Sequence, residues 1–445
     1  MRLIRYGNKG ADVELTQLAL ERAGYDVGGV DGKFGMKTLK AVMRFQAAQG
    51  LSADGIVGEK TRAKLEPYIM GYATHKVVRG DTFFRLAQKY GSTVELIAAA
   101  NPSVAANNIQ IGEILIIPFD YDIVPTDVTY TSALNSYMVR GLAARYPFIR
   151  VDSIGKSVME QNIPALTIGR GTKRVAYNAS HHANEWITTP VLLKFVEEYA
   201  KSYIDFGSIG GLDARELYDA SSLTVIPMVN VDGVDLVNGA IDTSDMYYVN
   251  AKRIAAAYPD IPFPSGWKAN IAGTDLNLNY PAGWENAREI KYAQGYISPA
   301  PRDFVGTSPL SAPEASAMYK FTLEAGFRLT LSYHSQGKVI YWKYLNIEPS
   351  GSYETALAFG DVSGYSVEET PMQSGYAGYK DWFILQFDLP GYTIEVGKGT
   401  NPLPLSQFDE IYRDNVGILA LGMKLAPSKT AETMSAEISD GFNAD

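Results

Sequence analysis

Cysteine is absent from this chain of 445 residues, and histidine occurs only four times. The absence of cysteine excludes disulfides and thiol chemistry, which leaves His, Asp and Glu as the side chains able to hold a metal ion. No apolar run approaches the roughly 20 residues that a bilayer span needs. The net charge of −9 argues against a general nucleic-acid binder. The whole chain is 46% hydrophobic and 20% charged, a composition typical of globular proteins. Its length predicts more than one domain.

Three of the histidines stand beside polar or acidic residues at the ends of strand-like segments. His182 and Glu185 form an HxxE pair, and His334 ends a later segment. Two imidazoles and one carboxylate make a three-ligand set for one zinc ion, with a position left open for water. Glu395, which ends a further strand-like segment, can then serve as general base. We read the adjacent His181 as structural. The combination predicts a zinc hydrolase.

Residues 124–425 alternate strand-like and helix-like segments, which predicts an α/β domain whose mixed sheet is covered by helices. Strands are expected to end at Ala179, Asn230, His334 and Glu395, with helices near 190–202, 311–325 and 407–424. Sites in such sheets form beyond the carboxyl ends of the strands. The chemical residues all fall at such ends, and this agreement outweighs any one motif. Around Asn230, we expect the polar residues to shape a turn.

The first 70 residues contain a short internal repeat, because residues 31–38 resemble residues 54–61. Each copy has an Asp-Gly turn followed by a threonine, Thr38 or Thr61, that we expect to cap a helix. The segment predicts a small three-helix bundle over residues 1–70. This pattern resembles peptidoglycan-binding domains of the three-helix type, which implies wall binding; an inert helical spacer is the alternative.

Residues 74–119 predict a second small unit in the order strand, helix, helix, strand. The turn residues 80–82, Asn101-Pro102 and Ile111-Gly112 fall between these elements. The unit resembles a LysM module, and that resemblance implies binding to a glycan that contains N-acetylglucosamine. We expect His75 to lie in the first strand without a catalytic role.

Over about 300 residues, the same strand-end set resembles the zinc carboxypeptidase family M14. His182 and Glu185 match the family's HxxE ligands, His334 its third ligand, and Glu395 its general base, preceded at the family's spacing by Asp381-Trp382. The resemblance implies one zinc ion as cofactor.

Further roles follow from the same resemblance. Asp275, in the segment that matches GVDxN, is implied to orient the ring of His182, with a plain turn residue as the alternative. Lys268, after Trp267, is the candidate for stabilising the oxyanion, and Arg253 is the fallback. The remaining candidates for positioning or substrate contact are Asn277, Tyr376 and Tyr379.

One departure from the carboxypeptidase pattern bears on the substrate. The family's Asn-Arg-Asn segment reads Asn277-Leu278-Asn279 here, and leucine cannot clamp the carboxylate of a peptide C-terminus. Asn184 also replaces an arginine often found in the HxxE segment. With Ala300-Pro301-Arg302-Asp303 and residues 379–382, these changes resemble the branch of γ-D-glutamyl-L-diamino acid endopeptidases. That resemblance implies cleavage of the γ-D-Glu–meso-diaminopimelate bond of peptidoglycan stem peptides.

Two other functions stay open at this point: a wall-tethered metallocarboxypeptidase, and a non-catalytic wall-binding protein with a decayed peptidase fold. The expected partners are peptidoglycan glycan and stem peptides, with no nucleic acid and no membrane span. Because no export signal is visible, we keep wall association, secretion, a link to sporulation and residence in the cytoplasm as alternatives. Residues 426–445 are polar and acidic and are expected to form a flexible tail. The oligomeric state stays open.

Overall fold

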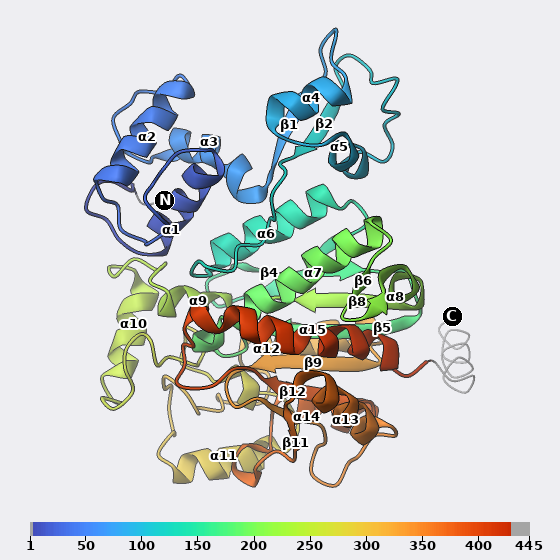
Figure 1. Ribbon diagram of the computed structural model, residues 1–445. Coiled ribbons are helices and arrows are strands. Elements are labelled where there is room, and N and C mark those ends of the chain that lie inside the picture. Colours follow the sequence, from blue (N-terminus) through green and yellow to red (C-terminus); the bar gives the residue numbers. More distant parts are fainter. Residues whose placement is uncertain (1–2, 429–445) are drawn as a thin grey trace, which may run out of the picture.

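The computed structural model describes residues 3–428 of the chain. Its N-terminal part is a bundle of three helices, α1, α2 and α3 (Ala11–Arg22, Met36–Ala48 and Glu59–Met70), at the blue end of the ribbon in Figure 1. Apolar side chains from all three helices, such as Leu20, Phe45 and Leu65, are buried together. The predicted three-helix unit is therefore present.

The two threonines of the internal repeat do not cap helices, so the prediction that they act as N-caps was wrong. Helices α2 and α3 begin at Met36 and Glu59, so Thr38 and Thr61 lie inside the first turn. Each hydroxyl points inward and accepts a hydrogen bond from a buried glutamine, Gln17 for Thr38 and Gln46 for Thr61, both at 3.1 Å.

Each glutamine also holds the Asp-Gly turn of its copy. Gln46 donates to the Asp54 carboxylate at 2.9 Å and accepts from the amide of Gly55 at 2.9 Å. Gln17 makes the matching bonds to Asp31 and to the amide of Gly32. The repeat is thus a turn fastened to a helix by one buried amide side chain.

The second unit has the predicted order. Strands β1 (Tyr72–Lys76) and β2 (Ile114–Pro118) pair antiparallel, and helices α4 (Phe83–Tyr90) and α5 (Val94–Ala100) lie between them in the chain. Thr82 and Thr93 cap these two helices, because each hydroxyl accepts from the backbone three residues on.

The large domain is built on a mixed sheet of eight strands in the order β11-β10-β12-β9-β5-β8-β4-β3. Its centre, β12-β9-β5-β8, is parallel, while β4 and β10 run antiparallel to their central neighbours. The strands are β3 (Arg150–Lys156), β4 (Asn162–Ile168), β5 (Lys173–Ala179), β8 (Ser221–Ile226), β9 (Leu329–His334), β10 (Val339–Tyr341), β11 (Ser366–Glu368) and β12 (Gly391–Glu395). The second predicted strand ends at Ile226, four residues before Asn230.

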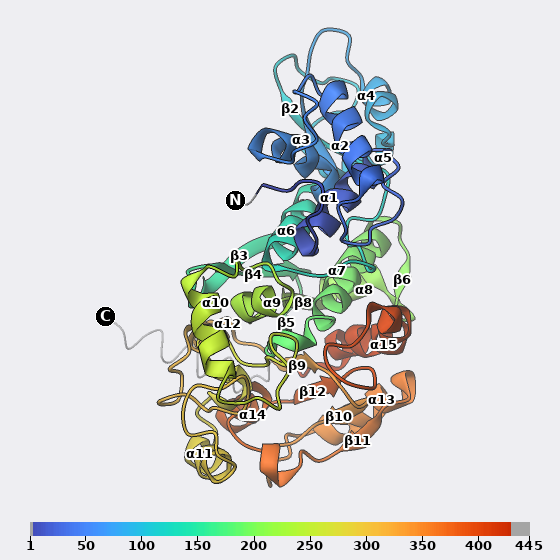
Figure 2. The same cartoon turned by 90° about the vertical axis from the view of Figure 1, so that its left-hand side faces the viewer.

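Helices cover both faces of this sheet, and two neighbouring residues of β5 show why. Side chains alternate between the faces of a strand. Tyr177 points to one face, where its hydroxyl donates to the carbonyl of Leu419 in α15 (Phe408–Leu425). Ala176 points to the other, where it packs against Phe383 of α14 (Tyr379–Phe387). Figures 1 and 2 show the sheet between these layers.

The other elements complete these layers and the loops at the sheet edge. The remaining helices are α6 (Ser132–Arg145), α7 (Thr188–Ile204), α8 (Ala214–Ala220), α9 (Val231–Val237), α10 (Met246–Ala255), α11 (Trp284–Ala293), α12 (Pro313–Ala325) and α13 (Ser352–Ser363). Four 3-10 turns cover Ala183–Glu185, Leu276–Leu278, Met372–Ser374 and Leu405–Gln407, and β6 (Ser208–Ile209) pairs with β7 (Leu212–Asp213).

Two arginines fasten the small units to the large domain. Arg22 donates to the carbonyls of Ile69, Asp122 and Ile123 at 2.9–3.1 Å. Arg145 of α6 donates to the carbonyls of Tyr121, Gly71 and Phe119. Charge-assisted bonds to backbone give the three units a defined relative placement.

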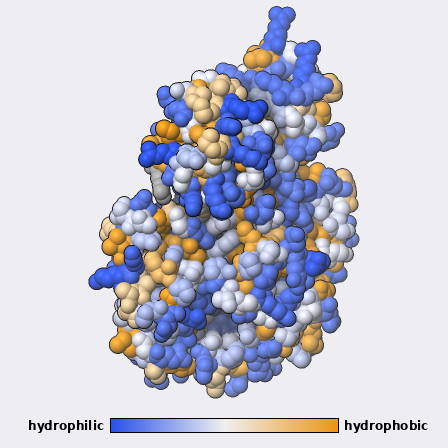
Figure 3. Space-filling view, turned by 60° about the vertical axis from the view of Figure 1, so that its left-hand side comes forward, coloured by the Kyte–Doolittle hydropathy of each residue, from blue (hydrophilic) through white to orange (hydrophobic). Residues whose placement is uncertain are grey.

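The surface is largely hydrophilic on the face in Figure 3, where hydrophobic residues are dispersed. Within residues 3–428, no helix has the length and apolar character needed to span a membrane. The predicted tail covers residues 426–445. Its residues 429–445 lie outside the part of the chain that the structure describes.

The buried glutamines generate a prediction about stability. Gln46→Leu removes the side-chain hydrogen bonds from α2 to Asp54, Gly55 and Ile56, and leaves the buried Gly55 amide without the acceptor that Gln46 supplies. We expect the bundle to lose about 2–4 kcal/mol, measured by hydrogen exchange on peptides from residues 36–65. Arg44→Leu, an exposed change on the same helix, should alter the exchange free energy by about 0.5 kcal/mol or less. Equal effects of the two changes would contradict the structural role of Gln46.

Candidate functional site

The parallel pairing at the centre of the sheet brings the predicted chemical residues to one edge. His334 is the last residue of β9 and lies directly opposite Glu395, the last residue of β12. Strand β5 is the other neighbour of β9, and the HxxE segment follows its end. The three strand ends therefore meet at one place, although Glu395 lies 216 positions after Ala179 in the chain.

The HxxE loop is held by backbone bonds and by Asn230. The amide of Ala183 donates to the carbonyl of Lys268 at 2.9 Å. Asn230 donates to the carbonyls of His181 and Ala269 and accepts from the amide of Gly233, which caps α9. Asn230 therefore shapes a turn, as expected from the sequence, and in doing so it ties the HxxE loop to the Lys268 segment.

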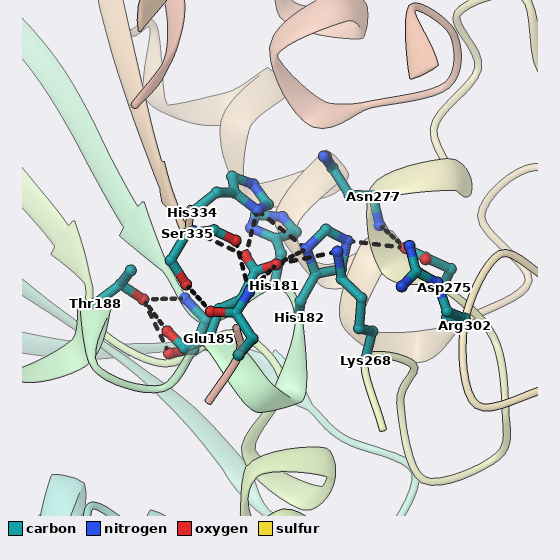
Figure 4. A network of polar contacts seen from close by, with 12 residues as sticks. His181, His182, Glu185, Thr188, Lys268, Asp275, Asn277, Arg302, His334 and Ser335 are labelled. Atoms are coloured by element: carbon teal, nitrogen blue, oxygen red, sulfur yellow. Dashed lines mark hydrogen bonds and ion pairs between the residues drawn. The ribbon is translucent and has the colours of Figure 1, made fainter. Parts of the chain in front are cut away.

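Figure 4 shows that His182, Glu185 and His334 converge on a common point. The Nδ1 atoms of the two histidines lie 3.1 Å apart, and the two carboxylate oxygens of Glu185 lie 3.0 Å from His182 Nδ1 and 2.9 Å from His334 Nδ1. One ligand atom from each residue falls within 4.8 Å of the others.

This donor set fits a zinc ion. It offers two imidazole nitrogens and one carboxylate, which are ligands that zinc takes in catalytic sites. The second nitrogen of His182, Nε2, lies 3.1 Å from Asp275 Oδ1. A carboxylate there holds the proton on Nε2, so that Nδ1 presents a lone pair to the metal point. His182, Glu185 and His334 thus form a candidate metal-binding site.

The site carries strong and opposed charges. Although burial alone would raise the pKa of Glu185, the neighbouring His182 and Lys268 hold it well below its usual value. Lys268 contributes through its ammonium, whose Nζ lies 3.1 Å from Glu185 Oε1. Burial and the nearby Glu185 carboxylate raise the pKa of Glu395 to about 8. Glu395 therefore sits where a proton is readily taken up.

The pocket in front of these residues has a volume of about 230 Å³. Its wall contains His182, His334, Lys268, Glu395, Asp275 and Asn277. Asp275 also accepts from the amides of Asn277 and Asp303, which fixes its carboxylate beside His182. Asn277 accepts from the amide of Tyr379 at 3.0 Å.

Three residues considered from the sequence lie elsewhere. Tyr379 is fully buried, and its hydroxyl pairs with that of Thr322 at 2.9 Å, so it does not face the pocket. Tyr376 is half-buried and packs with the cluster around Trp284, outside the pocket wall. Arg253 is exposed on α10 and bonds to Asn250, so the fallback for Lys268 is not in the site.

His181 is buried beside the site without joining the donor set. Its Nε2 lies 3.0 Å from the hydroxyl of Tyr280, and its ring stacks near that of His334. Burial lowers its pKa well below the usual value, which keeps the ring neutral. This agrees with the structural role expected from the sequence.

Charged residues on the pocket wall include several to which the sequence assigned no role: Lys291, Arg302, Asp303, Lys380 and Asp381. Asp303 pairs with both Lys291 and Arg302, each at 2.6 Å. Arg302 uses Nε for that bond, and no described residue bonds its two Nη atoms. In the sequence, Arg302 was noted only as part of the segment Ala300-Pro301-Arg302-Asp303, which resembles the endopeptidase branch. No local pattern indicates that its loop reaches the pocket.

Comparisons with known proteins agree with this geometry. The family model described as zinc carboxypeptidase matches residues 135–417, and those of a peptidoglycan binding domain and of the LysM domain match residues 9–65 and 75–118. The γ-D-glutamyl-L-diamino acid endopeptidase 1 of Lysinibacillus sphaericus is 44% identical over 298 residues, which are 66% of this chain and 72% of that protein.

Two further similarities extend the comparison. The uncharacterized protein YqgT of Bacillus subtilis is 40% identical over 276 residues, 62% of this chain and 72% of its own length. The crystal structure of thrombin activatable fibrinolysis inhibitor aligns with a TM-score of 0.53 and 17% identity, over 73% of this chain and 90% of that one, which shows a shared fold. The family match covers well over half of the sequence and contains the donor set at the strand ends, and on these grounds the chain belongs to the zinc carboxypeptidase family.

Proposed function

We propose that this chain is a zinc endopeptidase that hydrolyses the γ-D-glutamyl–meso-diaminopimelate bond of peptidoglycan stem peptides. The observation that carries the reaction class is the convergence of His182, Glu185 and His334 beside Glu395 in one pocket. The name of the Lysinibacillus sphaericus relative supports the bond, and the two wall-binding modules support the substrate.

The chain's own residues divide the work as follows. His182, Glu185 and His334 would hold the zinc ion, and the bound ion would supply a Lewis acid for the scissile carbonyl and for water. Glu395 takes a proton from the attacking water and passes it to the leaving amine. Its raised pKa suits a group that must hold that proton between the two steps.

Lys268 is assigned to the developing negative charge on the carbonyl oxygen. Its ammonium lies beside the candidate metal ligands, with Nζ 3.1 Å from a carboxylate oxygen of Glu185. Burial disfavours the charge on Lys268, but the Glu185 and Asp275 carboxylates outweigh it and raise the pKa, so the side chain stays cationic. A fixed cation in a site shielded from water stabilises an oxyanion without reorganisation.

Leu278 has no group that binds a carboxylate, so another residue must bind the carboxylate of the substrate. Its side chain packs with Trp284, Val305 and Ala377 in an apolar cluster at the pocket wall. We assign the carboxylate to Arg302, whose Nη atoms face no described partner and whose guanidinium can bind a carboxylate through two parallel bonds. A γ-linked D-glutamate carries a free α-carboxylate on the residue whose γ-carbonyl is attacked, and its Cα, Cβ and Cγ atoms separate the two groups, so a cation on the pocket wall can bind the carboxylate away from the metal ligands.

The proposal assigns residues 1–70 and 74–119 to wall binding and residues 124–425 to catalysis, and the family matches fall inside these ranges. It implies residence at the cell wall, where the substrate lies. A wall-tethered metallocarboxypeptidase is the second candidate function, and the loss of the clamping arginine at Leu278 speaks against it. A non-catalytic wall binder is the third, and the complete donor set speaks against that.

Product analysis tests the bond. We expect L-Ala-γ-D-Glu-meso-diaminopimelyl-D-Ala, incubated with zinc-loaded protein, to release L-Ala-D-Glu, as identified by mass spectrometry. Release of D-Ala alone would instead support the carboxypeptidase. If zinc-loaded protein releases neither product, while zinc is bound with one ion per chain, the proposed reaction is wrong.

The role of Glu395 separates metal binding from turnover. Glu395→Gln keeps the shape of the side chain and removes the base, so we expect zinc content near that of the original protein and a loss in kcat of about 10²–10⁴-fold. His334→Ala serves as the contrast, because it removes a ligand and should lower zinc content as well. Unchanged turnover in the Glu395 variant would exclude it as the general base.

The role of Arg302 can be tested with a matched pair of substrates. We expect Arg302→Met to raise KM for the stem peptide by about 10–100-fold, since it removes a charge-assisted bond. A peptide whose D-glutamate α-carboxylate is amidated should show a much smaller change, because it offers no anion. Arg253→Met, an exposed arginine outside the pocket, is the control. An equal rise in KM for both peptides would assign Arg302 a structural role.

A further inference from the structure

A cavity of about 600 Å³ lies where the helical bundle, the LysM module and the segment after β2 meet. Its wall combines α3, β1, the end of α4 and residues 119–121. In Figures 1 and 2, the bundle and the β1–β2 unit lie next to each other above α6. Neither module forms this cavity alone, and its volume falls in the range of small-molecule sites.

Aromatic rings form much of the wall. Tyr68 of α3 stacks on Phe119, with ring centroids 5.3 Å apart and planes at 14°, and Tyr121 lies against Phe119 at 5.7 Å. Tyr90, at the end of α4, contributes a fourth ring from the LysM side. Such rings offer flat apolar faces with polar tips, which suits ligands that are apolar on one face and hydroxylated at the edge.

Two lysines that form no ion pair within residues 3–428 flank these rings. Lys64 comes from α3 and Lys89 from α4, and both are exposed. Lys89 instead places its Nζ 5.1 Å from the centroid of the Tyr90 ring. Among the described residues of the wall, Asp120 is the single acid, and it is also exposed. The cavity thus carries an excess of positive charge in a chain whose net charge is −9.

The cavity is fixed in place before any ligand arrives. Tyr121 donates from its hydroxyl to the carbonyl of Tyr68 at 2.7 Å, which joins the segment after β2 to α3. Arg22 lies over the ring of Tyr121 and donates to backbone carbonyls on both sides of the junction. Arg145 of α6 holds the same segment from the catalytic domain. Preorganisation of this kind reduces the entropic cost of binding.

We propose that this junction cavity is a third glycan site, which binds an anionic segment of the wall glycan between the two wall-binding modules. The sugar packs against those parts of the Tyr68 and Tyr121 rings that line the cavity, since Phe119 stacks on Tyr68 and Arg22 lies over Tyr121. A carboxylate of the attached stem peptide or lactyl group pairs with Lys64 and Lys89. Because Arg145 ties the cavity to α6, glycan bound here has a fixed placement relative to the catalytic domain. This inference rests on the proposed function for its ligand.

The test compares two double variants with the same change in charge. Lys64→Glu/Lys89→Glu reverses both cavity lysines, and Lys252→Glu/Lys320→Glu reverses two exposed lysines of the large domain, outside the cavity and outside the pocket of the candidate site. Full-length protein is pelleted with purified insoluble peptidoglycan. We expect the cavity variant to raise the apparent Kd at least about tenfold, and the control variant about twofold or less. Equal losses would mean that only overall charge matters, and no loss in the cavity variant would also overturn the proposal.

Two further measurements keep the outcomes distinct. Binding to a neutral N-acetylglucosamine oligomer should be alike in both variants, since it has no carboxylate; its loss in the cavity variant would show general damage and would overturn the role of charge. Turnover of the soluble stem peptide should match the original protein in both variants. If the original protein cleaves no stem peptide, the proposed reaction fails, whereas the comparison of wall binding still decides the cavity.

Discussion

The candidate site depends on the parallel pairing of β5, β9 and β12. Strands that run in the same direction end at the same edge of a sheet, so each can deliver one group to a common point. Here the register places Glu395 directly beside His334, while the loop after β5 delivers His182 and Glu185. A shift of one residue in this register would turn the side chains to the opposite face of the sheet. The buried apolar residues of these strands therefore secure the chemistry as well as the fold.

The concentration of charge at that edge is tolerated because each group has a counterpart. Glu185 lies within 3.1 Å of both histidine ligands and of Lys268, and Asp275 holds the far side of His182. An isolated charge at such depth would be costly, whereas paired and hydrogen-bonded charges are retained. Glu395 is the exception, because no described residue forms an ion pair with it, and burial together with the nearby Glu185 carboxylate raises its pKa to about 8.

The small modules and the catalytic domain share backbone contacts that make them one structural unit. Arg22 and Arg145 reach carbonyls of the segment between the LysM strand β2 and α6 from opposite sides. The modules therefore hold a defined position above α6. Modules held by these contacts have a defined placement relative to the catalytic pocket, and this distinguishes the arrangement from a connection by a linker alone.

The sequence by itself determined the features that depend on local spacing. The HxxE pair, the strand-end positions of His334 and Glu395, the three-helix unit and the strand-helix-helix-strand unit all follow from short-range pattern, because side-chain period and turn chemistry are local properties. The sequence also allowed Asp275 and Lys268 to be named as candidates, because each stands in a segment that resembles the zinc carboxypeptidase family. The starts of α2 and α3 could not be predicted correctly. Thr38 and Thr61 resemble helix caps locally, but their hydroxyls face inward and bind Gln17 and Gln46 from elsewhere in the chain.

Only the tertiary structure decided which distant loops line the pocket. It places Arg302 on the wall and turns Tyr379 into the core, although both lie in segments that the sequence singled out. It also creates the cavity at the module junction, whose residues come from separate elements between Arg22 and Tyr121. The physical reason is the same in each case: the direction of a loop side chain depends on long-range packing and on hydrogen bonds to distant backbone, which no local pattern encodes.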